Sequence, residues 1–392
     1  MTPNGADTSS GSTLPVDRPL RIVHCFRSPV GGLFRHVADL TQEQARNGHS
    51  VGIVCDSSTG GEFEERLFER LLPALALGLK RFPMRRQVSP SDLAASWRML
   101  REIRSLNPDV LHAHGAKGGA YARNIGALLR VSGSRVARIY TPHGGSLHYD
   151  PKSMGGRVYF VTERLLERMT EALIFVSDYE ADAYREKVGP PRPPVTLARN
   201  GLRPEEFETI TPDADAVDFL YIGMLRDLKG TDIFIEALAE IGKRKGKAPT
   251  ALIVGDGPDK AKYQESVRSL GLTETTRFHD PMPAREAFRK TRVVVVPSRA
   301  ESMPYIVLET IGAGIPLIAT RVGGIPEIYG PHSDHLIPPG DAEALADTML
   351  EAANNPTATQ ARAVALRSHI MPLFSIEAMA RSIAGAYRQV AR

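Results

Sequence analysis

Cysteine and tryptophan are nearly absent from this chain of 392 residues, which contains two cysteines and one tryptophan. Cys25 and Cys55 each end a short apolar run, IVHC and VGIVC, so they suit reduced, buried thiols better than a disulfide, although the sequence alone leaves the bond open. No apolar run approaches the ~18 residues that a membrane-spanning helix needs. A disulfide-stapled domain and a membrane-spanning protein are therefore both disfavoured.

A signal peptide and a large charge of one sign are also lacking. Residues 1–18 are polar and have no apolar signal core, so we expect a disordered leader there and a cytoplasmic protein. The net charge of +4 is mildly basic, which is compatible with acidic substrates or an anionic membrane surface and does not indicate nucleic acid. With 42% hydrophobic residues, the length predicts a globular protein of two domains.

The G-x-G-x-x-G fingerprint of dinucleotide-binding proteins is missing as well. Residues 20–26 and 51–55 predict strands that flank a helix over 33–46, with Gly31-Gly32 at the helix start. This opening is Rossmann-like and predicts a doubly wound parallel sheet. An NAD-dependent oxidoreductase or epimerase would share the architecture, but it should show the fingerprint after the first strand.

The remainder repeats the alternation of strands and helices, with a break after Asn200-Gly201 in the acid- and proline-rich stretch 203–215. We therefore expect an N-terminal domain over 19–205, a C-terminal domain over 206–370, and a last helix within 371–392 that packs back on the first domain. Asp213 and Asp215 superficially match a metal-binding acid pair, but they lie in the linker and are interpreted as solvated charge.

Residues 62–79 predict a helix, and the following LKRFPMRRQ mixes basic residues with Phe82 and Met84. This pattern is compatible with docking on anionic lipid and equally with a solvated face whose arginines extend along apolar surface. Both interpretations stay open.

Three histidines lie near predicted strand ends. His112 and His114 share one strand face, but a metal site needs a third ligand and the neighbouring sequence indicates none. They are interpreted as core or ligand-contacting residues. His143 stands beside Gly144-Gly145 after the strand 138–141, which makes it a stronger site candidate, because open α/β sheets bind ligands at the carboxyl ends of their strands.

The stretch 292–324 carries the strongest chemical signal. Residues 293–296 form a four-valine strand, Pro304 marks a helix start, and the carboxylates Glu301 and Glu309 bracket it. The acids are either a cap and an exposed helix residue, or acceptors for the hydroxyls of a ligand whose phosphates meet the helix N–H groups. Arg226 and Lys229, in the loop LRDLKG, favour the second interpretation, because a cation pair suits a diphosphate without any metal.

Through these motifs the chain resembles the retaining glycosyltransferases of family 4, which have the GT-B fold of two facing Rossmann-like domains. The resemblance runs from Leu20 to the C-terminus. It rests on E-x7-E after VVPS, the YIG and LKG segments, the GDG turn, GAGIPLIATRVGGIPE and IPPGD at 337–341. The GT-B α/β fold is therefore the expected fold class.

The resemblance also implies roles for residues. Glu301 would contact the donor sugar, Glu309 the ribose, and Arg226 with Lys229 the diphosphate. The implied catalytic residues are Glu301, His143, Arg226 and Lys229. The implied substrate-binding residues are Gly31, Gly32, Asn200, Gly223, Ser302, Met303, Tyr305 and Glu309. This chain departs from the family at Met224, where arginine is usual, at Pro304, where glycine is frequent, and at His279-Asp280.

The implied activity is the transfer of a hexose from a UDP- or GDP-sugar to a hydroxyl of a glycan, which is expected to be lipid-linked, in polysaccharide or lipopolysaccharide biosynthesis. Retention at the anomeric carbon, no metal and no cofactor are expected, with peripheral attachment at the inner face of the cell membrane. The alternative is a non-catalytic sugar-nucleotide-binding or assembly subunit whose site has decayed.

Overall fold

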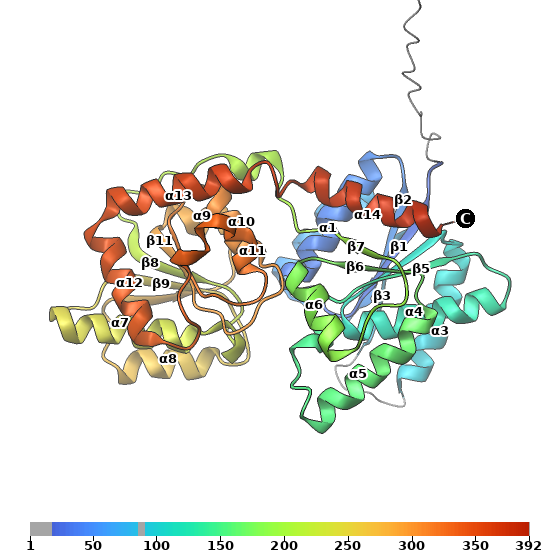
Figure 1. Ribbon diagram of the computed structural model, residues 1–392, viewed down its shortest axis with the longest axis horizontal. Helices are drawn as coiled ribbons and strands as arrows, with labels where there is room; N and C mark the ends of the chain where they lie inside the picture. Colours follow the sequence, from blue (N-terminus) through green and yellow to red (C-terminus); the bar gives the residue numbers. More distant parts are fainter. Residues whose placement is uncertain (1–17, 85–90, 392) are drawn as a thin grey trace, which may run out of the picture.

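The computed structural model describes residues 18–84 and 91–391, which form two α/β domains side by side (Figure 1). The predicted fold of two Rossmann-like parallel sheets is confirmed. The expected leader over 1–18 lies almost wholly outside the described residues. No helix in the described part of the chain is long and apolar enough to cross a membrane.

The first domain contains a seven-stranded parallel sheet in the order β3-β2-β1-β4-β5-β6-β7. Its strands are β1 Arg21–Phe26, β2 Ser50–Asp56, β3 Gly78–Phe82, β4 Val110–His114, β5 Ala137–Thr141, β6 Ala172–Phe175 and β7 Val195–Leu197. Its helices are α1 Gly31–Arg46, α2 Glu62–Leu71, α3 Ser91–Leu106, α4 Ala116–Val131, α5 Met154–Leu166 and α6 Asp178–Lys187. The chain order reverses between β1 and β4, the kind of switch point at which such sheets bind ligands.

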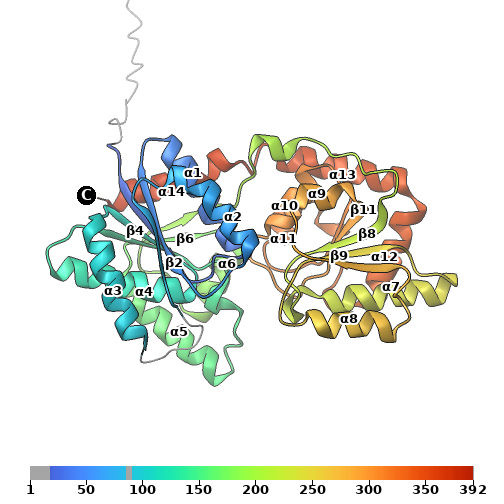
Figure 2. The same cartoon turned by 180° about the vertical axis from the view of Figure 1, so that it is seen from behind.

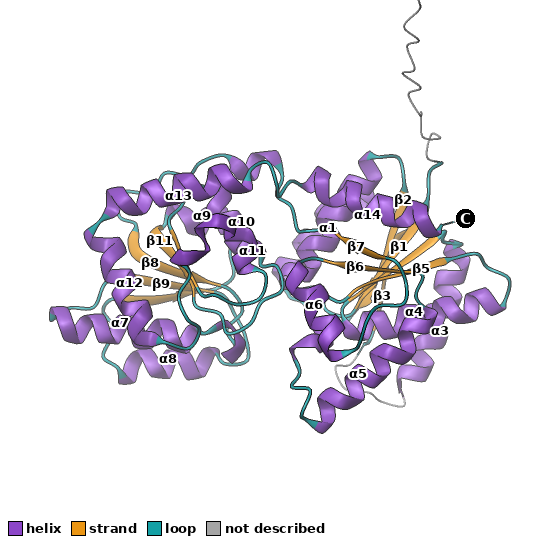
Figure 3. Cartoon of the chain, in the orientation of Figure 1, coloured by secondary structure: helices purple, strands orange, loops and turns teal. Residues whose placement is uncertain are grey.

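The second domain contains a five-stranded parallel sheet in the order β10-β9-β8-β11-β12, and helices lie on both sides of each sheet (Figure 3). Its strands are β8 Val217–Ile222, β9 Ala251–Val254, β10 Thr276–His279, β11 Thr291–Val296 and β12 Leu317–Ala319. Its helices are α7 Thr231–Lys245, α8 Lys260–Ser269, α9 Ala284–Arg289, α10 Tyr305–Gly312, α11 Ile325–Tyr329, α12 Ala342–Asn354 and α13 Pro356–Ile370.

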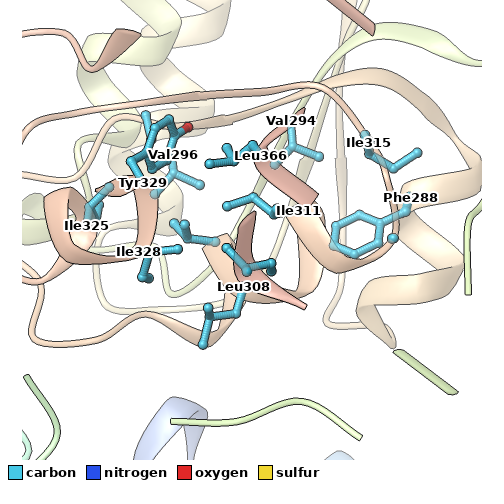
Figure 4. Packing of buried hydrophobic residues seen from close by; sticks show 14 of the residues in the cluster. Phe288, Val294, Val296, Leu308, Ile311, Ile315, Ile325, Ile328, Tyr329 and Leu366 are labelled. Carbon is cyan, nitrogen blue, oxygen red and sulfur yellow. The ribbon is translucent and has the colours of Figure 1, made fainter. Parts of the chain in front are cut away.

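Apolar side chains of β11, α10 and α11 form the core that supports the loop around Glu301. Val294 and Val296 point toward Leu308 and Ile311 of α10, and α11 closes the same cluster (Figure 4). Each of these side chains is almost fully buried, which stabilises the domain by roughly 1.5–3 kcal/mol apiece. The loop between β11 and α10 therefore joins two elements that are fixed by packing.

The last helix, α14 Ile376–Val390, crosses from the second domain to the first (Figure 2). It packs against α1, β5, β6 and β7, and its apolar face, with Ile383 and Tyr387 buried, completes a core cluster of the first domain.

The predicted helix over 62–79 was wrong. Helix α2 ends at Leu71, and a short 3-10 turn with Pro73 follows, because proline cannot continue the helical hydrogen bonding. Gly78 has φ +78°, and the chain then enters the edge strand β3. Lys80 and Arg81 therefore belong to a strand. Helices α9 and α13 were not anticipated.

The two cysteines are free and buried, as predicted. Burial raises the pKa of Cys55 to about 12, and it raises the pKa of Cys25 further. Both thiols are therefore protonated and unreactive, and their role is to pack in the core.

Candidate active site

The site lies where the loops at the carboxyl ends of both sheets meet. A Cβ on Gly144, after β5, would overlap His148 and Ser302 Oγ, and a Cβ on Gly32 would lie 3.7 Å from the Tyr305 ring. These approaches join the first domain to the loop before α10. Gly144 also has φ +75°, a left-handed backbone conformation that favours glycine at this position.

Lys229 and Glu301 form the central ion pair. Lys229 Nζ donates to both carboxylate oxygens of Glu301, at 2.6 and 2.8 Å, and Ser298 Oγ donates to Oε1 at 2.7 Å. Glu301 is 7% exposed, whereas the Lys229 side chain is 31% exposed. The two residues that the sequence assigned to the sugar and the diphosphate are thus adjacent, with the cation on the more open side.

Two glycine turns fix this pair. Gly230 has φ +69°, and a Cβ there would overlap the carbonyl oxygen of Pro297, so the turn carrying Lys229 lies directly against the strand end that precedes Glu301. Gly323 lies with equal closeness on the carbonyl of Glu301, and the Gly324 N–H donates to the Ser302 carbonyl at 2.8 Å. Left-handed backbone at Gly230 and Gly323 favours glycine at both positions.

Ser302 Oγ is buried and has no hydrogen-bond partner among the described residues. A buried hydroxyl without a partner costs free energy unless a ligand or water satisfies it. Its position against Gly144 makes it a polar group that is available at the junction of the two domains.

Glu309, on α10, pairs with the Arg35 guanidinium from α1 of the first domain. Arg35 also binds Glu206 at 2.5 and 2.6 Å and Asp39 at 2.9 Å, and it lies over the Tyr305 ring with its guanidinium carbon 4.8 Å from the ring centre. Burial raises the pKa of Glu309, and the neighbouring Glu206 and Asp39 charges add to this effect. The sequence analysis missed Arg35, although it stands only three residues after Gly32 in the helix.

His143 belongs to a cluster of five histidines that includes His24, His36, His112 and His114. Burial lowers the pKa of His24 and His36 to about 4 and holds the pKa of the other three well below its usual value. The expectation that His112 and His114 have no third histidine nearby was wrong, because parallel pairing of β1 with β4 places His24 beside His112. Nitrogen atoms of His24, His112 and His114 lie within 4.8 Å of one another, and so do those of His36, His114 and His143.

Asn200 connects this cluster to the second domain. Its Oδ1 lies 2.9 Å from His36 Nδ1, and its Nδ2 donates to the Met303 carbonyl at 2.7 Å. Asn200 and Met303, both predicted as substrate-binding, are buried, and their observed contacts are with protein groups.

The remaining predicted residues surround the same region. Gly223 directly follows β8, and a Cβ on Gly255 would overlap its carbonyl oxygen, so the two turns are in direct contact. Arg226 precedes the 3-10 turn Asp227–Lys229, and its charge, with those of Lys229 and Glu301, acts on His148. His148 was missed by sequence reasoning. Burial, the largest effect, lowers its pKa. Met224 is 37% exposed where the family usually carries arginine.

A further contact between the domains involves Glu327 of α11. Its carboxylate accepts from the backbone N–H groups of Asp178 and Tyr179, at 2.9 and 2.7 Å, at the start of α6. Helix α6 lies at the boundary of the domains in both opposite views (Figures 1 and 2). The carboxylate satisfies N–H groups that a helix start leaves unpaired and meets the positive end of its dipole.

Two family profiles match the chain. The profile described as Glycosyltransferase Family 4 matches residues 30–206, and the profile described as Glycosyl transferases group 1 matches residues 216–355. Glycogen synthase of Mycobacterium tuberculosis is 26% identical over 379 residues, which cover 91% of each chain.

Two solved structures share the fold. Sucrose-phosphate synthase from Thermosynechococcus elongatus superposes with a TM-score of 0.75 at 20% identity, over 94% of this chain and 98% of that one. WaaG, a glycosyltransferase involved in lipopolysaccharide biosynthesis, superposes with a TM-score of 0.66 at 16% identity, over 94% and 99%.

The buried histidines predict a loss of stability in mild acid. The pKa of His24 is about 4 in the folded state against 6.5 for an unperturbed histidine, so the unfolded chain binds more protons below pH 6.5, and the free energy of unfolding falls as pH falls toward 4. Between pH 7 and pH 5 we expect a loss of roughly 2 kcal/mol for each such histidine. Burial raises the pKa of Glu180 to about 7 and also raises the pKa of Glu309, so these two carboxylates act in the opposite sense, but they are fewer than the five histidines of the cluster.

Urea denaturation at pH 7 and pH 5 measures this loss. His24→Gln should reduce it by roughly the contribution of one histidine, whereas His335→Gln, at an exposed position, should leave it unchanged. An identical pH 5 loss in His24→Gln and the wild type would show that His24 is not its source.

Proposed function

Because this chain belongs to the group 1, family 4 glycosyltransferases, we propose that it transfers a hexose from a UDP- or GDP-sugar to a hydroxyl of a glycan acceptor, with retention at the anomeric carbon. The observation that carries the proposal is the Lys229–Glu301 pair at the junction of the two domains. It places a partly exposed cation beside a carboxylate, as a sugar diphosphate requires.

In the proposed reaction, Lys229 and Arg226 bind the diphosphate and stabilise the negative charge that develops on the leaving phosphate. Glu301 binds hydroxyls of the donor sugar. The departing phosphate accepts the proton of the acceptor hydroxyl, so no dedicated protein base is needed. Fixed cations supply the electrostatic stabilisation, and for this reason we propose metal-independent transfer.

Glu309 is proposed to bind the donor ribose. Arg35 occupies its Oε1, while Oε2 accepts no hydrogen bond from the described residues. A ribose hydroxyl donating to Oε2 would satisfy the second oxygen without displacing Arg35.

We propose that the acceptor is lipid-linked and that the first domain docks on an anionic membrane, in polysaccharide or lipopolysaccharide biosynthesis at the cytoplasmic face. The basic stretch near Lys80 is a poor docking surface, because Lys80 pairs with Glu102, and Arg81 with Glu65; Arg85 and Arg86 lie outside the described residues.

Helix α5 provides a better surface. Met154, Val158, Val161 and Leu165 are 84%, 63%, 61% and 53% exposed, which forms an apolar stripe along the helix. Lys152 and Arg157 are exposed beside it. Apolar residues flanked by cations are typical of helices that lie on anionic lipid.

The alternative is a subunit that binds a nucleotide sugar without transferring it, with Met224 in the position where the family usually carries an arginine. Binding without turnover would identify it.

Lys229→Ala should lower turnover by about 10²–10³-fold, because it removes the charge that stabilises the leaving phosphate. Transfer from the preferred nucleotide sugar measures it, with Lys243→Ala, an exposed cation on α7, as the control that keeps wild-type turnover. The wild type should remain active in excess EDTA. Near wild-type turnover of Lys229→Ala, or strict dependence on Mg²⁺ or Mn²⁺, would contradict the proposed mechanism.

Glu309→Gln should weaken donor binding by roughly 1.5–3 kcal/mol, the value of a charge-assisted hydrogen bond. A thermal-shift series with UDP-, GDP- and ADP-sugars first identifies the donor, because a ligand that binds the folded state raises the unfolding temperature. Glu206→Gln is the matched control, since it also removes a carboxylate from Arg35. If both variants keep the donor-induced shift, the ribose assignment is wrong.

Val158→Glu with Leu165→Glu should reduce binding to vesicles of anionic phospholipid by roughly tenfold or more, because two apolar contacts are lost and two negative charges are added. Vesicle sedimentation measures the bound fraction. Val364→Glu changes a similarly exposed valine, 54% exposed on α13 of the other domain, and should bind as the wild type does. Equal binding by all three proteins would remove α5 as the docking surface.

A further inference from the structure

A chain of hydrogen bonds runs from Gln44 of α1 through buried histidines to His143. Gln44 Oε1 lies 2.8 Å from His24 Nε2, His24 Nδ1 lies 3.0 Å from His114 Nε2, and His114 Nδ1 lies 3.0 Å from His143 Nε2. Gln44, His24 and His114 are buried, whereas His143 is partly exposed. The chain therefore leads from the interior of the first domain to the loop that meets Ser302.

The amide of Gln44 gives the chain a direction. Gln44 Nε2 donates to Tyr387 Oη at 3.2 Å, so Oε1 faces His24. An amide oxygen only accepts, and His24 Nε2 must therefore carry the hydrogen. A neutral imidazole has one N–H and one lone pair, which leaves His24 Nδ1 as an acceptor for His114 Nε2–H. Because His114 then carries its hydrogen on Nε2, its Nδ1 is the acceptor for His143 Nε2–H.

We infer that Gln44 holds His143 in the tautomer protonated on Nε2 and so presents His143 Nδ1 as a hydrogen-bond acceptor. We assign this acceptor to a hydroxyl of the donor sugar, and the assignment rests on the proposed function. Gln44, His24 and His114 are positioning residues, since they act on the sugar through His143. His143 has φ +52°, a left-handed conformation that is uncommon for a residue with a side chain and sets the ring at the loop.

Tyr387 of α14 fixes the Gln44 end of this hydrogen-bond chain. Its hydroxyl accepts from Gln44 and lies 2.6 Å from His112 Nδ1, and His112 Nε2 in turn lies 2.9 Å from Thr141 Oγ1. The orientation of the Gln44 amide thus depends on a residue that lies 343 positions away in the sequence. Removal of the Tyr387 hydroxyl frees the amide to turn and removes the preference for one tautomer.

The spacing of these nitrogens is also compatible with a metal ion, but a metal needs lone pairs without hydrogens converging on one point. The pairs at 3.0 Å instead match N–H to lone pair along the chain. Stoichiometric zinc in the purified protein, measured by elemental analysis, would overturn the inference.

The experiment is histidine-labelled ¹⁵N NMR of the full chain, in which two-bond proton–nitrogen correlations distinguish the two tautomers. We expect His143 protonated on Nε2 in the wild type and a mixture in Tyr387→Phe and Gln44→Met. Tyr184→Phe, which removes a buried hydroxyl that has no hydrogen-bond partner among the described residues, should keep the wild-type tautomer. An Nδ1-protonated His143 in the wild type, or an unchanged His143 tautomer in both Tyr387→Phe and Gln44→Met, would overturn the inference.

Kinetics supply the second measurement. Tyr387→Phe should raise the donor KM by roughly fivefold, the fold-change that one neutral hydrogen bond is worth, with kcat within about twofold of the wild type. An unchanged donor KM in a variant with mixed tautomers would overturn the assignment to the sugar. Failure of the wild type to use any nucleotide sugar would count against the proposed function. The NMR measurement needs no donor and tests the hydrogen bonds from Gln44 to His143 independently.

Discussion

Arg35 is the centre of an ion-pair cluster that joins the two domains. It comes from the first domain and contacts Glu309 of the second, with Glu206 of the connecting segment and Asp39 of its own helix around it. Arg203 is the second cation, paired with Asp39, so two cations face three carboxylates. Partly buried ion pairs lose much of their attraction to desolvation, and such a cluster therefore contributes geometry more than stability. Burial, together with the negative charges of Glu206 and Asp39, raises the pKa of Glu309, so a hydroxyl that donates to its carboxylate would stabilise the ionised form.

The loop that carries Glu301 is fixed in a different way, by close backbone packing. Gly230 approaches Pro297, Gly323 approaches Glu301 and Gly144 approaches Ser302, each so closely that a Cβ would overlap its neighbour. Elements on either side of the loop are held by the apolar core around β11 and α10. Glu301 and Lys229 thus meet on a rigid support, which is what preorganised stabilisation of a developing charge requires. Ser302 Oγ, buried without a partner in the described part of the chain, is the polar group left over at this junction.

Local sequence patterns predicted much of the fold around Glu301 and Lys229. The four valines before Pro297 predicted β11, and the motif order placed Glu301 and Lys229 in one site, because both follow strands of one sheet. Strand β3 was missed because it is a short edge strand whose basic residues mimic a solvated or lipid-facing segment. The pairs Arg35–Glu309 and His24–His114 could not be predicted, since 274 and 90 residues separate their members, and only the packing of the domains and the strand order bring them together. The resemblance supplied the E-x7-E pair but carried no information on the residue that opposes Glu309.

Helix α1 explains why these distant contacts occur together. Residues four apart lie on one face of a helix, so His36 and Gln44, eight apart, point the same way, toward Asn200 and the histidine chain. Arg35 points toward α10. Asp39, four residues later, lies on the same face of α1 and pairs with it. One rigid helix therefore carries the contacts for the proposed ribose site, the domain connection and the tautomer of His143. Since α14 packs along α1 and supplies Tyr387, a shift of α1 relative to the sheet would disturb all three contacts at once. The C-terminal helix, which returns to the first domain, is thus connected through α1 to the proposed donor site.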